Sequence, residues 1–301
     1  MKKQQLDEKL RILVIGGHPA DVFDHCGGTL AHHVKNGDSV TCLALTQGLR
    51  VHDTVISEVF RFSTEGYSQE DIERICKERE EVKYQEVRDA CAIFGITDVR
   101  FLSYDDKMLQ VTMPMIDATA KVIRDVRPDL IITHYPQTCG NVTNHHGNAA
   151  KIALDGAALS GVVDFDDPNP AWRVPQFAFM LNPSDCMAFG ALSGHSLAVP
   201  NYFVDVTDVV DLKVRALDQM KSQQYAGQYA RKSVESWNGV FGFFKGTSYC
   251  EGFVMNTSEV GSLLSVSDYL RIRANQPEID HRTRDTRLLA YKVPYEETDN
   301  G

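Results

Sequence analysis

The stretch ILVIGGHPAD, which spans residues 12–21, decides how this chain folds. Its first four residues are aliphatic, which predicts a buried β-strand. A helix is predicted to begin at Gly28, so the residues between them form a loop at the carboxyl end of that strand. Ligands bind at this edge of open α/β sheets. His18 and Asp21 therefore place an imidazole and a carboxylate where they could hold a divalent metal, with a third ligand supplied from elsewhere.

The composition is that of an ordinary globular protein. The chain has 301 residues, of which 43% are hydrophobic and 24% are charged, enough for one large α/β domain or two small ones. The net charge of −10 argues against binding to nucleic acid or to an anionic membrane surface. We expect the partner to be a small-molecule substrate.

The sequence also bears on the compartment. Residues 1–9 lack the apolar core of a signal peptide, and no run of about 18 apolar residues predicts a transmembrane helix. The seven cysteines are scattered and odd in number, without a Cys-x-x-Cys motif, which is typical of reduced thiols. We therefore expect a cytoplasmic protein that makes no contact with membranes.

Strand and helix signals alternate along the first half of the chain. The alternation predicts a Rossmann-like α/β fold, with a mostly parallel sheet and helices on both faces. We interpret residues 1–301 as a single domain of this class. Apolar runs predict strands at residues 12–16, 39–46, 99–102, 130–134 and 249–255, and a further short apolar run lies at residues 177–181. Helical patterns cover residues 28–36, 71–94, 115–126, 146–158 and 204–222.

Two segments do not follow this alternation. Residues 48–70 form a long insert directly after the second strand, and because such loops often close over a binding site, we expect a lid there. Residues 256–301 follow the last predicted strand, and we interpret them as a C-terminal extension.

The third metal ligand is expected near the end of a strand that neighbours the first. The run at residues 130–134 supplies such a strand and ends in His134, and the loop after it leads to His145 and His146 at the start of a helix. Adjacent helical residues diverge by about 100°, so His145 and His146 are not expected to bind one ion together. His146 is the first candidate, and His134 is the competing ligand.

Three motifs together resemble the PIG-L/LmbE family of zinc-dependent N-deacetylases. The family carries His-Pro-Asp-Asp, Gly-Gly-Thr and His-x-Asp-His, and this chain has His18-Pro19-Ala20-Asp21, Gly27-Gly28-Thr29 and Thr143-Asn144-His145-His146. Later parts of the family pattern are similar to Arg79-Glu80, Lys213 and Glu251-Gly252-Phe253. The resemblance covers most of residues 11–255.

The resemblance implies a zinc ion held by His18, Asp21 and His146, with water in an open position whose pKa can fall to about 7. Histidine and aspartate ligands also admit Mn²⁺ or Fe²⁺, so the choice of metal stays open. The family resemblance further implies a homo-oligomer.

The same resemblance shows three departures from the deacetylase pattern. Ala20 stands where the family carries the Asp that acts as general base, Thr143 where a His steadies the oxyanion, and His145 where an Asp orients the metal-binding His. The His-x-Ala-Asp motif is nearest to that of the 4-oxalomesaconate hydratases, which add water across a carbon–carbon double bond. In that branch a Glu on the loop after the second strand is implicated as acid or base, and Leu49 stands at the corresponding position here.

Several side chains could replace the missing base. His145 beside the metal is the first choice and His52 is the second, because an unperturbed imidazole titrates at about pH 6.5. Asp53 and Glu58 on the insert are further candidates.

Other side chains are candidates for binding the substrate. Arg50 could bind a substrate carboxylate in bidentate fashion. Thr143 and His134 are further candidates for substrate contact.

These observations favour a metal-dependent hydrolase or hydratase that activates water against a small carbonyl- or carboxylate-bearing metabolite. Hydration, or ring- or C–C-type chemistry, is favoured because the usual general base is replaced by Ala20. One alternative is an N-deacetylase or other amide hydrolase with a relocated base. The second alternative is a catalytically inactive, metal-binding homologue.

Overall fold

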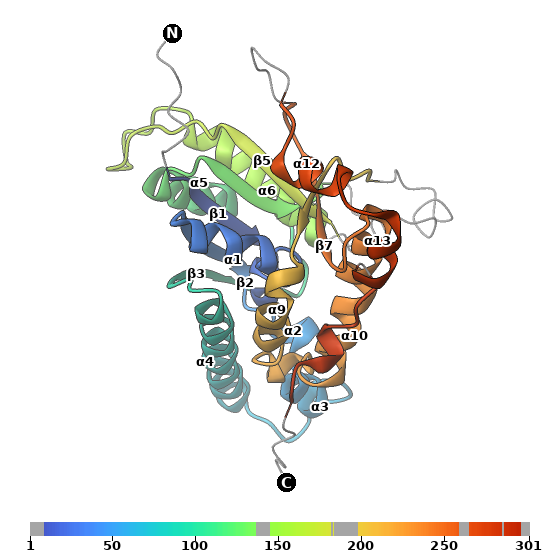
Figure 1. Cartoon of the computed structure of the whole chain (residues 1–301). Coiled ribbons are helices and arrows are strands. Elements are labelled where there is room, and N and C mark those ends of the chain that lie inside the picture. The colour runs from blue at the N-terminus through green and yellow to red at the C-terminus, as the bar shows by residue number, and fades with distance from the viewer. Residues whose placement is uncertain are drawn as a thin grey trace.

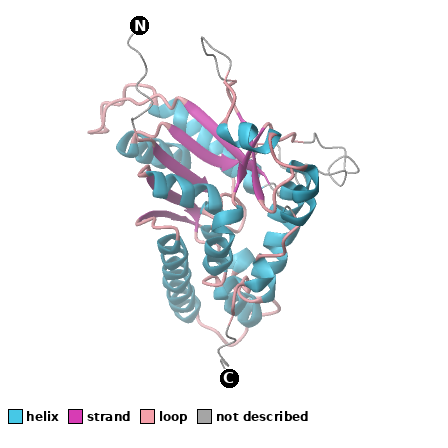
Figure 2. Ribbon diagram, viewed as in Figure 1, coloured by secondary structure: helices cyan, strands magenta, loops and turns pink. Residues whose placement is uncertain are grey.

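A seven-stranded mixed sheet forms the centre of the protein (Figure 1, Figure 2). The computed structural model describes residues 9–136, 145–181, 183, 198–258, 265–284 and 286–295. The strands are β1 (Arg11–Gly16), β2 (Ser39–Thr46), β3 (Asp98–Tyr104), β4 (Leu130–His134), β5 (Gln176–Leu181), β6 (Tyr202–Asp205) and β7 (Cys250–Met255). They lie in the order β3-β2-β1-β4-β5-β7-β6.

The direction in which strands are added to the sheet reverses at β1. β2 and β3 extend the sheet on one side of β1, and β4 pairs with β1 on the other side, all in parallel. β5 continues the parallel part, whereas β7 is antiparallel to both β5 and β6. The carboxyl ends of β1 and β4 therefore flank the topological switch point, which is where sheets of this kind bind ligands.

Helices cover both faces of the sheet, as predicted. Side chains of β1 alternate between two hydrophobic clusters, with Ile12 and Val14 in one and Leu13 and Ile15 in the other. The first cluster is completed by α1 (Gly27–Asn36), α4 (Gln69–Ile93), α9 (Val210–Leu217) and α10 (Gln228–Val234). The second is completed by α5 (Met113–Val126) and α6 (His145–Ser160). The Rossmann-like α/β architecture is thus confirmed.

The insert and the C-terminal extension are both folded where the structure describes them. The insert at residues 48–70 contains α2 (Leu49–His52) and α3 (Thr54–Phe60) before α4 begins. The extension carries α12 (Asp268–Ala274) and α13 (Glu278–Arg284). The Tyr249 hydroxyl accepts hydrogen bonds from the backbone N–H groups of Leu289 and Ala290, which joins the extension to β7.

The predicted helix at residues 204–222 is wrong at its start. Val204 belongs to β6, where it pairs with Glu251 of β7, and helical structure begins only at Thr207. The edge of β7 offers this segment a ladder of backbone hydrogen bonds. A pattern of apolar residues along one segment cannot reveal such a distant partner.

A buried carboxylate joins the last strand to the first helix. Glu251 of β7 accepts hydrogen bonds from the backbone N–H groups of Gly28 and Thr29 (3.0 and 2.8 Å) and from Lys213 Nζ (2.7 Å). A carboxylate is favourable at the start of α1 because the free N–H groups and the helix dipole both attract negative charge. A Cβ added at Gly28 would lie 2.6 Å from the Cβ of Val206, so this helix start requires glycine. The contacts explain why the Gly-Gly-Thr and Glu-Gly-Phe motifs occur in one sequence.

Among the described residues, no helix is both long enough and apolar enough to cross a bilayer. The described cysteines are free thiols, namely Cys26, Cys42, Cys76, Cys91 and Cys250.

We expect Lys213→Met to lower the free energy of unfolding by about 3–5 kcal/mol, because it leaves the buried Glu251 carboxylate without its counter-ion. Arg215→Met on the same helix removes only an exposed pair with Asp211, and should cost less than about 0.5 kcal/mol. Urea denaturation followed by circular dichroism measures both losses. Equal effects of the two substitutions would contradict the role of Lys213.

Candidate metal centre

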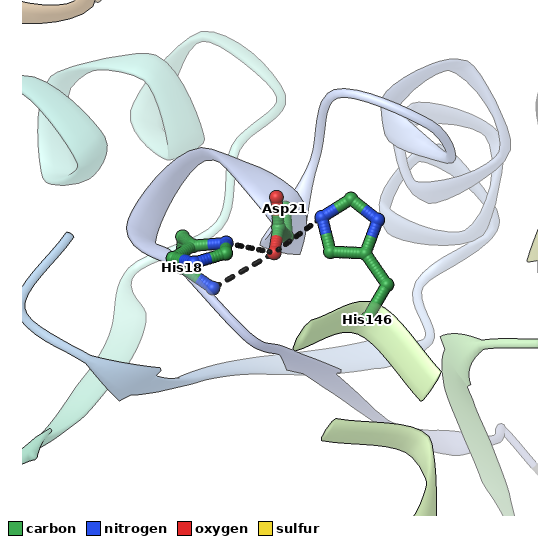
Figure 3. A group of neighbouring side chains, drawn as sticks. All are labelled: His18, Asp21 and His146. Carbon is green, nitrogen blue, oxygen red and sulfur yellow. Dashed lines mark hydrogen bonds and ion pairs between the residues drawn. The ribbon is translucent and has the colours of Figure 1, made fainter. Parts of the chain in front are cut away.

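His18, Asp21 and His146 come together at the switch point, although they are far apart in the sequence (Figure 3). One ligand atom from each residue lies within 4.8 Å of the other two. Asp21 Oδ2 is 3.2 Å from His18 Nδ1 and 3.6 Å from His146 Nε2. His18 and Asp21 flank the start of a 3₁₀ turn after β1, and His146 is the second residue of α6.

The local sequence forces the loop after β1 into this shape. Pro19 begins the 3₁₀ turn, and the backbone N–H of His18 donates to Asp21 Oδ2 at 2.7 Å, which closes the turn. A Cβ added at Gly16 would lie 2.7 Å from the Cβ of Asp21. The glycine therefore lets the Asp21 side chain fold back over the end of β1.

Charges around the cluster favour the protonation states that a metal needs in two of the three candidate ligands, Asp21 and His146. Burial alone would raise the pKa of Asp21, but the imidazoles of His146, His134 and His18 outweigh burial and hold the pKa well below its usual value. Burial and the neighbouring His134 lower the pKa of His146 well below the usual value. Asp21 is therefore ionised and His146 is neutral at pH 7, as metal ligands must be. Burial opposes protonation of His18, yet the Asp21 carboxylate raises its pKa overall.

The donor set fits a small divalent cation. Ligand atoms bound tetrahedrally to zinc at about 2.1 Å lie about 3.4 Å apart. The separations of 3.2 and 3.6 Å at Asp21 Oδ2 lie on either side of that value. Two imidazoles and one carboxylate suit zinc, and the same set also admits manganese or iron.

His134 lies behind the cluster and contacts two of its members. Its Nε2 donates to Asp21 Oδ2 at 3.1 Å, and its ring stacks on that of His146 with 4.0 Å between centroids. The side chain is almost fully buried. These contacts hold Asp21 and His146 in place, while a contact between His134 and substrate stays a prediction.

His145 and His146 diverge, as their helical spacing requires. His146 faces Asp21, whereas His145 Nδ1 lies 3.3 Å from His18 Nε2, so that one of these nitrogens donates to the other. Hydrogen bonds of this kind fix the orientation of a metal-binding imidazole. The other nitrogen of His145, Nε2, is buried without a hydrogen-bond partner among the described residues.

The insert brings His52 to the cluster. The His52 ring meets the His18 ring edge-on, with 4.6 Å between centroids and an interplanar angle of 79°. Burial, with a smaller contribution from His18, lowers the pKa of His52 to about 4. His52 is therefore neutral at pH 7 and can accept a proton.

The other residues predicted to bind or act on the substrate are placed differently. The Arg50 guanidinium binds the Asp105 carboxylate in bidentate fashion (2.7 and 2.8 Å), with both side chains more than half exposed. Asp53 is buried and paired with Arg79, so it is not available as a base. Glu58 is exposed on α3. Thr143 lies outside the described residues, and the predicted roles of Arg50 and Thr143 stay predictions.

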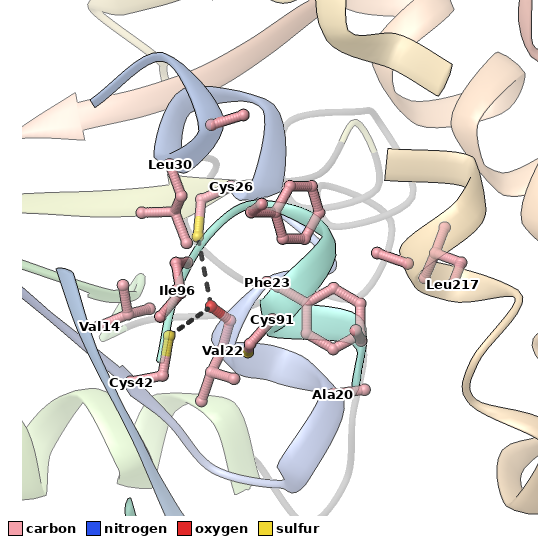
Figure 4. Close-up of a cluster of buried hydrophobic side chains, with 14 of the residues drawn as sticks. Val14, Ala20, Val22, Phe23, Cys26, Leu30, Cys42, Cys91, Ile96 and Leu217 are labelled. Atoms are coloured by element: carbon pink, nitrogen blue, oxygen red, sulfur yellow. Dashed lines mark hydrogen bonds between the residues drawn. The ribbon is translucent and has the colours of Figure 1, made fainter. Parts of the chain in front are cut away.

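Ala20 packs into the hydrophobic core beneath the loop (Figure 4). It belongs to the same cluster as Val22, Phe23 and Leu217, and only 1% of its surface is exposed. Position 20 therefore contributes a buried methyl group and no proton acceptor.

A second group of residues borders the centre, of which Asp24 and His25 are buried and Trp237 is half-buried. The His25 ring lies 6.4 Å from that of His146 and meets the Trp237 indole edge-on at 5.2 Å. Burial lowers the pKa of His25 to about 3, and burial followed by the Asp21 charge raises the pKa of Asp24 well above its usual value. Trp237 lies on a single π-helical turn (Glu235–Gly239), a distortion frequent at functional sites. Only its tertiary contacts link this group to the metal ligands.

The fold and the cluster define an α/β protein with a candidate metal centre at the carboxyl edge of a mostly parallel sheet. Residues 13–156 match the family described as PIG-L, GlcNAc-PI de-N-acetylase. Residues 13–156 therefore form a PIG-L domain, which confirms the PIG-L/LmbE resemblance noted in the sequence.

Known proteins similar to this chain include deacetylases and a hydratase. The diacetylchitobiose deacetylase of Thermococcus kodakarensis is 26% identical, over 71% of this chain and 70% of that protein. The 1D-myo-inositol 2-acetamido-2-deoxy-alpha-D-glucopyranoside deacetylase of Geodermatophilus obscurus is 25% identical, over 74% of this chain and 79% of that protein. The crystal structure of GalB, the 4-carboxy-2-hydroxymuconate hydratase from Pseudomonas putida KT2440, superposes with a TM-score of 0.65 at 18% identity. It covers 86% of this chain and 100% of that structure. At that identity the likeness concerns the fold.

We expect His18→Ala and His146→Ala each to abolish stoichiometric zinc binding, because each removes one of three ligands. His32→Ala, on the exposed side of α1, should retain the metal. Mass spectrometry of the metal content of purified protein measures the outcome. Zinc retained by His146→Ala but lost by His134→Ala would assign the third ligand to His134 instead.

We expect His145→Ala to raise the dissociation constant for zinc by about 10–100-fold, because it removes the hydrogen bond that orients His18. Competition with a chromogenic chelator measures this constant. An unchanged constant would mean that the 3.3 Å contact between His145 and His18 does not orient the ligand.

Proposed function

We propose that this protein is a metal-dependent enzyme that activates water, and that it hydrates a small unsaturated metabolite bearing carbonyl or carboxylate groups. A divalent ion held by His18, Asp21 and His146 would supply Lewis acidity and lower the pKa of water. In this proposal His52 accepts a proton from water. His134 and His145 hold the metal-binding side chains in position.

His52 suits the proton-accepting role better than His145. His145 Nδ1 already lies against His18 Nε2, so one of its two nitrogens is engaged. The His52 ring contacts the His18 ring through its edge and is neutral at pH 7, so it does not already carry the proton that it would accept. A proton acceptor must also lie within reach of the reacting water, and His52 is brought beside the metal ligands by α2.

The buried methyl group of Ala20 is the observation that carries the choice of hydration. Deacetylases of the family are expected to use a carboxylate at this position as general base, and a general base typically contributes about 10²–10⁴-fold to the rate. Here that position faces the hydrophobic core. The His-x-Ala-Asp motif is nearest to that of the hydratase branch, and the likeness of the fold to a hydratase is compatible with the proposal.

Amide hydrolysis with a relocated base is the second candidate. It is favoured by the sequence relatives, which are deacetylases of acetamido sugars or their conjugates and match more than 70% of this chain. In this case too, His52 would take the place of the missing carboxylate.

We expect zinc-loaded protein to turn over unsaturated keto-acids and to leave N-acetylglucosamine conjugates intact. His52→Ala should lower kcat by about 10²–10⁴-fold while zinc content stays at the wild-type level, because His52 handles a proton and does not hold the metal. His33→Ala, paired with Asp38 on α1, serves as the control. Absorbance assays for the keto-acids and amine release from the conjugates measure the two activities.

The outcomes separate the candidates. Turnover of the conjugates alone would overturn hydration in favour of amide hydrolysis. Stoichiometric zinc without turnover of either class would overturn both and leave the metal-binding homologue. A wild-type rate in His52→Ala would remove His52 from the mechanism.

A further inference from the structure

Three fully buried charged side chains converge on residues 49–53, the short segment that carries His52. They are Asp106 on the loop after β3, Lys83 on α4 and Asp53 in the segment itself. Charged side chains are almost never fully buried unless they are paired, and burial costs several kcal/mol for each ion. Burying three charged side chains around one turn of chain therefore costs free energy that has to be explained.

Asp106 holds the residues before His52. Its Oδ1 accepts from the backbone N–H groups of Leu49 and Arg50 (both 3.1 Å), and its Oδ2 accepts from that of Val51 (3.0 Å). These N–H groups begin α2 and have no partner within the helix, so one carboxylate satisfies three of them. Because α2 is a single turn, it would not persist without such a cap.

Lys83 and Asp53 hold His52 from the other side. Lys83 Nζ donates to the His52 carbonyl at 3.4 Å and to Ser222 Oγ at 3.1 Å. The Asp53 carboxylate accepts from Arg79 and from the backbone N–H of Ile56, which it caps. The turn that carries His52 is thus held by Asp106 from the loop after β3 and by Lys83 from α4.

The segment also packs directly on the metal-binding loop. Gly48, in the left-handed conformation with φ 64°, starts it, and a Cβ added there would lie 2.6 Å from Cδ of Pro19. Pro19 stands between His18 and Asp21. The position of α2 is therefore defined relative to the ligands themselves.

We propose that Asp106 is a positioning residue that holds the His52 ring against His18, with Lys83 and Asp53 as its supports. The proposal rests on the proposed function, in which His52 accepts a proton. It explains why three charges are buried around an insert that could otherwise be an exposed loop. It assigns a task to three side chains that have no hydrogen bond to the side chains of His18, Asp21 or His146.

The first test is a double-mutant cycle. Asp106→Ala should lower kcat by about 10–100-fold with little change in KM or zinc content, because His52 is misplaced while the ligands are intact. In a His52→Ala background the same substitution should change kcat by no more than about twofold, because the residue through which Asp106 acts is gone. A full additional loss in that background would overturn the proposal.

The matched control is Asp38→Ala. Asp38 is also a buried carboxylate that accepts a backbone N–H, that of Leu10 at 3.0 Å, but it lies at the amino end of β2, away from the cluster. Asp38→Ala should lower stability comparably and leave kcat unchanged. Equal losses of kcat in the two variants would indicate general destabilisation and would overturn the positioning role.

A second readout does not depend on turnover. Diethyl pyrocarbonate modifies neutral imidazoles, and mass spectrometry of the peptide around His52 gives the rate of that reaction. Asp106→Ala should raise this rate by about fivefold or more, and should speed hydrogen exchange at Leu49–Val51. Asp38→Ala should change neither. Unchanged reactivity of His52 in Asp106→Ala overturns the proposal, even if the wild-type protein turns over no substrate and the proposed function fails.

Asp106→Asn and Lys83→Met keep the test decisive if Asp106→Ala does not fold. The amide retains one acceptor oxygen for the helix N–H groups, so Asp106→Asn should show an intermediate rate of modification. Lys83→Met removes the ammonium group that donates to the His52 carbonyl and keeps most of the unbranched side chain, and it should raise the rate as well. Wild-type rates in both folded variants would overturn the proposal.

Discussion

The Asp21 carboxylate is the charge around which the candidate centre is arranged. One of its oxygens lies within 2.7–3.6 Å of the His18 backbone nitrogen and of ring nitrogens from His18, His134 and His146. A carboxylate buried alone would cost several kcal/mol, so its position requires these donors. The imidazoles in turn lose hydration and are stabilised by that single negative charge. The arrangement brings together side chains from β1, β4 and α6.

The sheet makes this meeting possible. Because the chain crosses from β3 back to β4 on the other side of β1, the loop after β1 and the start of α6 lie at the same edge. The last strand, β7, also supports this edge of the sheet. Its Glu251 caps α1 and so fixes the helix that follows the His18–Asp21 loop. The candidate metal centre, formed by the loop after β1 and the start of α6, is thus supported by β1, β4 and α1.

Much of this centre can be predicted from the sequence, because the patterns that indicate it lie within short segments of the chain. An aliphatic run before Gly-Gly-His-Pro predicts a strand end, and strand ends of a parallel sheet share one edge. The sequence therefore predicts that His18, Asp21 and His146 lie at one edge of the sheet, where the structure brings them together. The predicted start of the helix at residues 204–222 is wrong for the opposite reason, because the conformation there depends on a distant part of the chain. Val204 takes its conformation from Glu251, 47 positions later in the chain, and nothing within the segment reports that pairing.

The residues missed by sequence reasoning share this dependence on distant partners. Asp106 follows an ordinary edge strand, and its importance lies in three N–H groups that belong to another segment. Ala20, by contrast, is informative from sequence alone, since a methyl group cannot accept a proton in any fold. If the protein is an enzyme, its proton acceptor must then come from outside this motif. His52 is neutral at pH 7 and lies against His18, on an insert that buried charges hold in place. The proposed chemistry would therefore depend in part on the residues that anchor the insert.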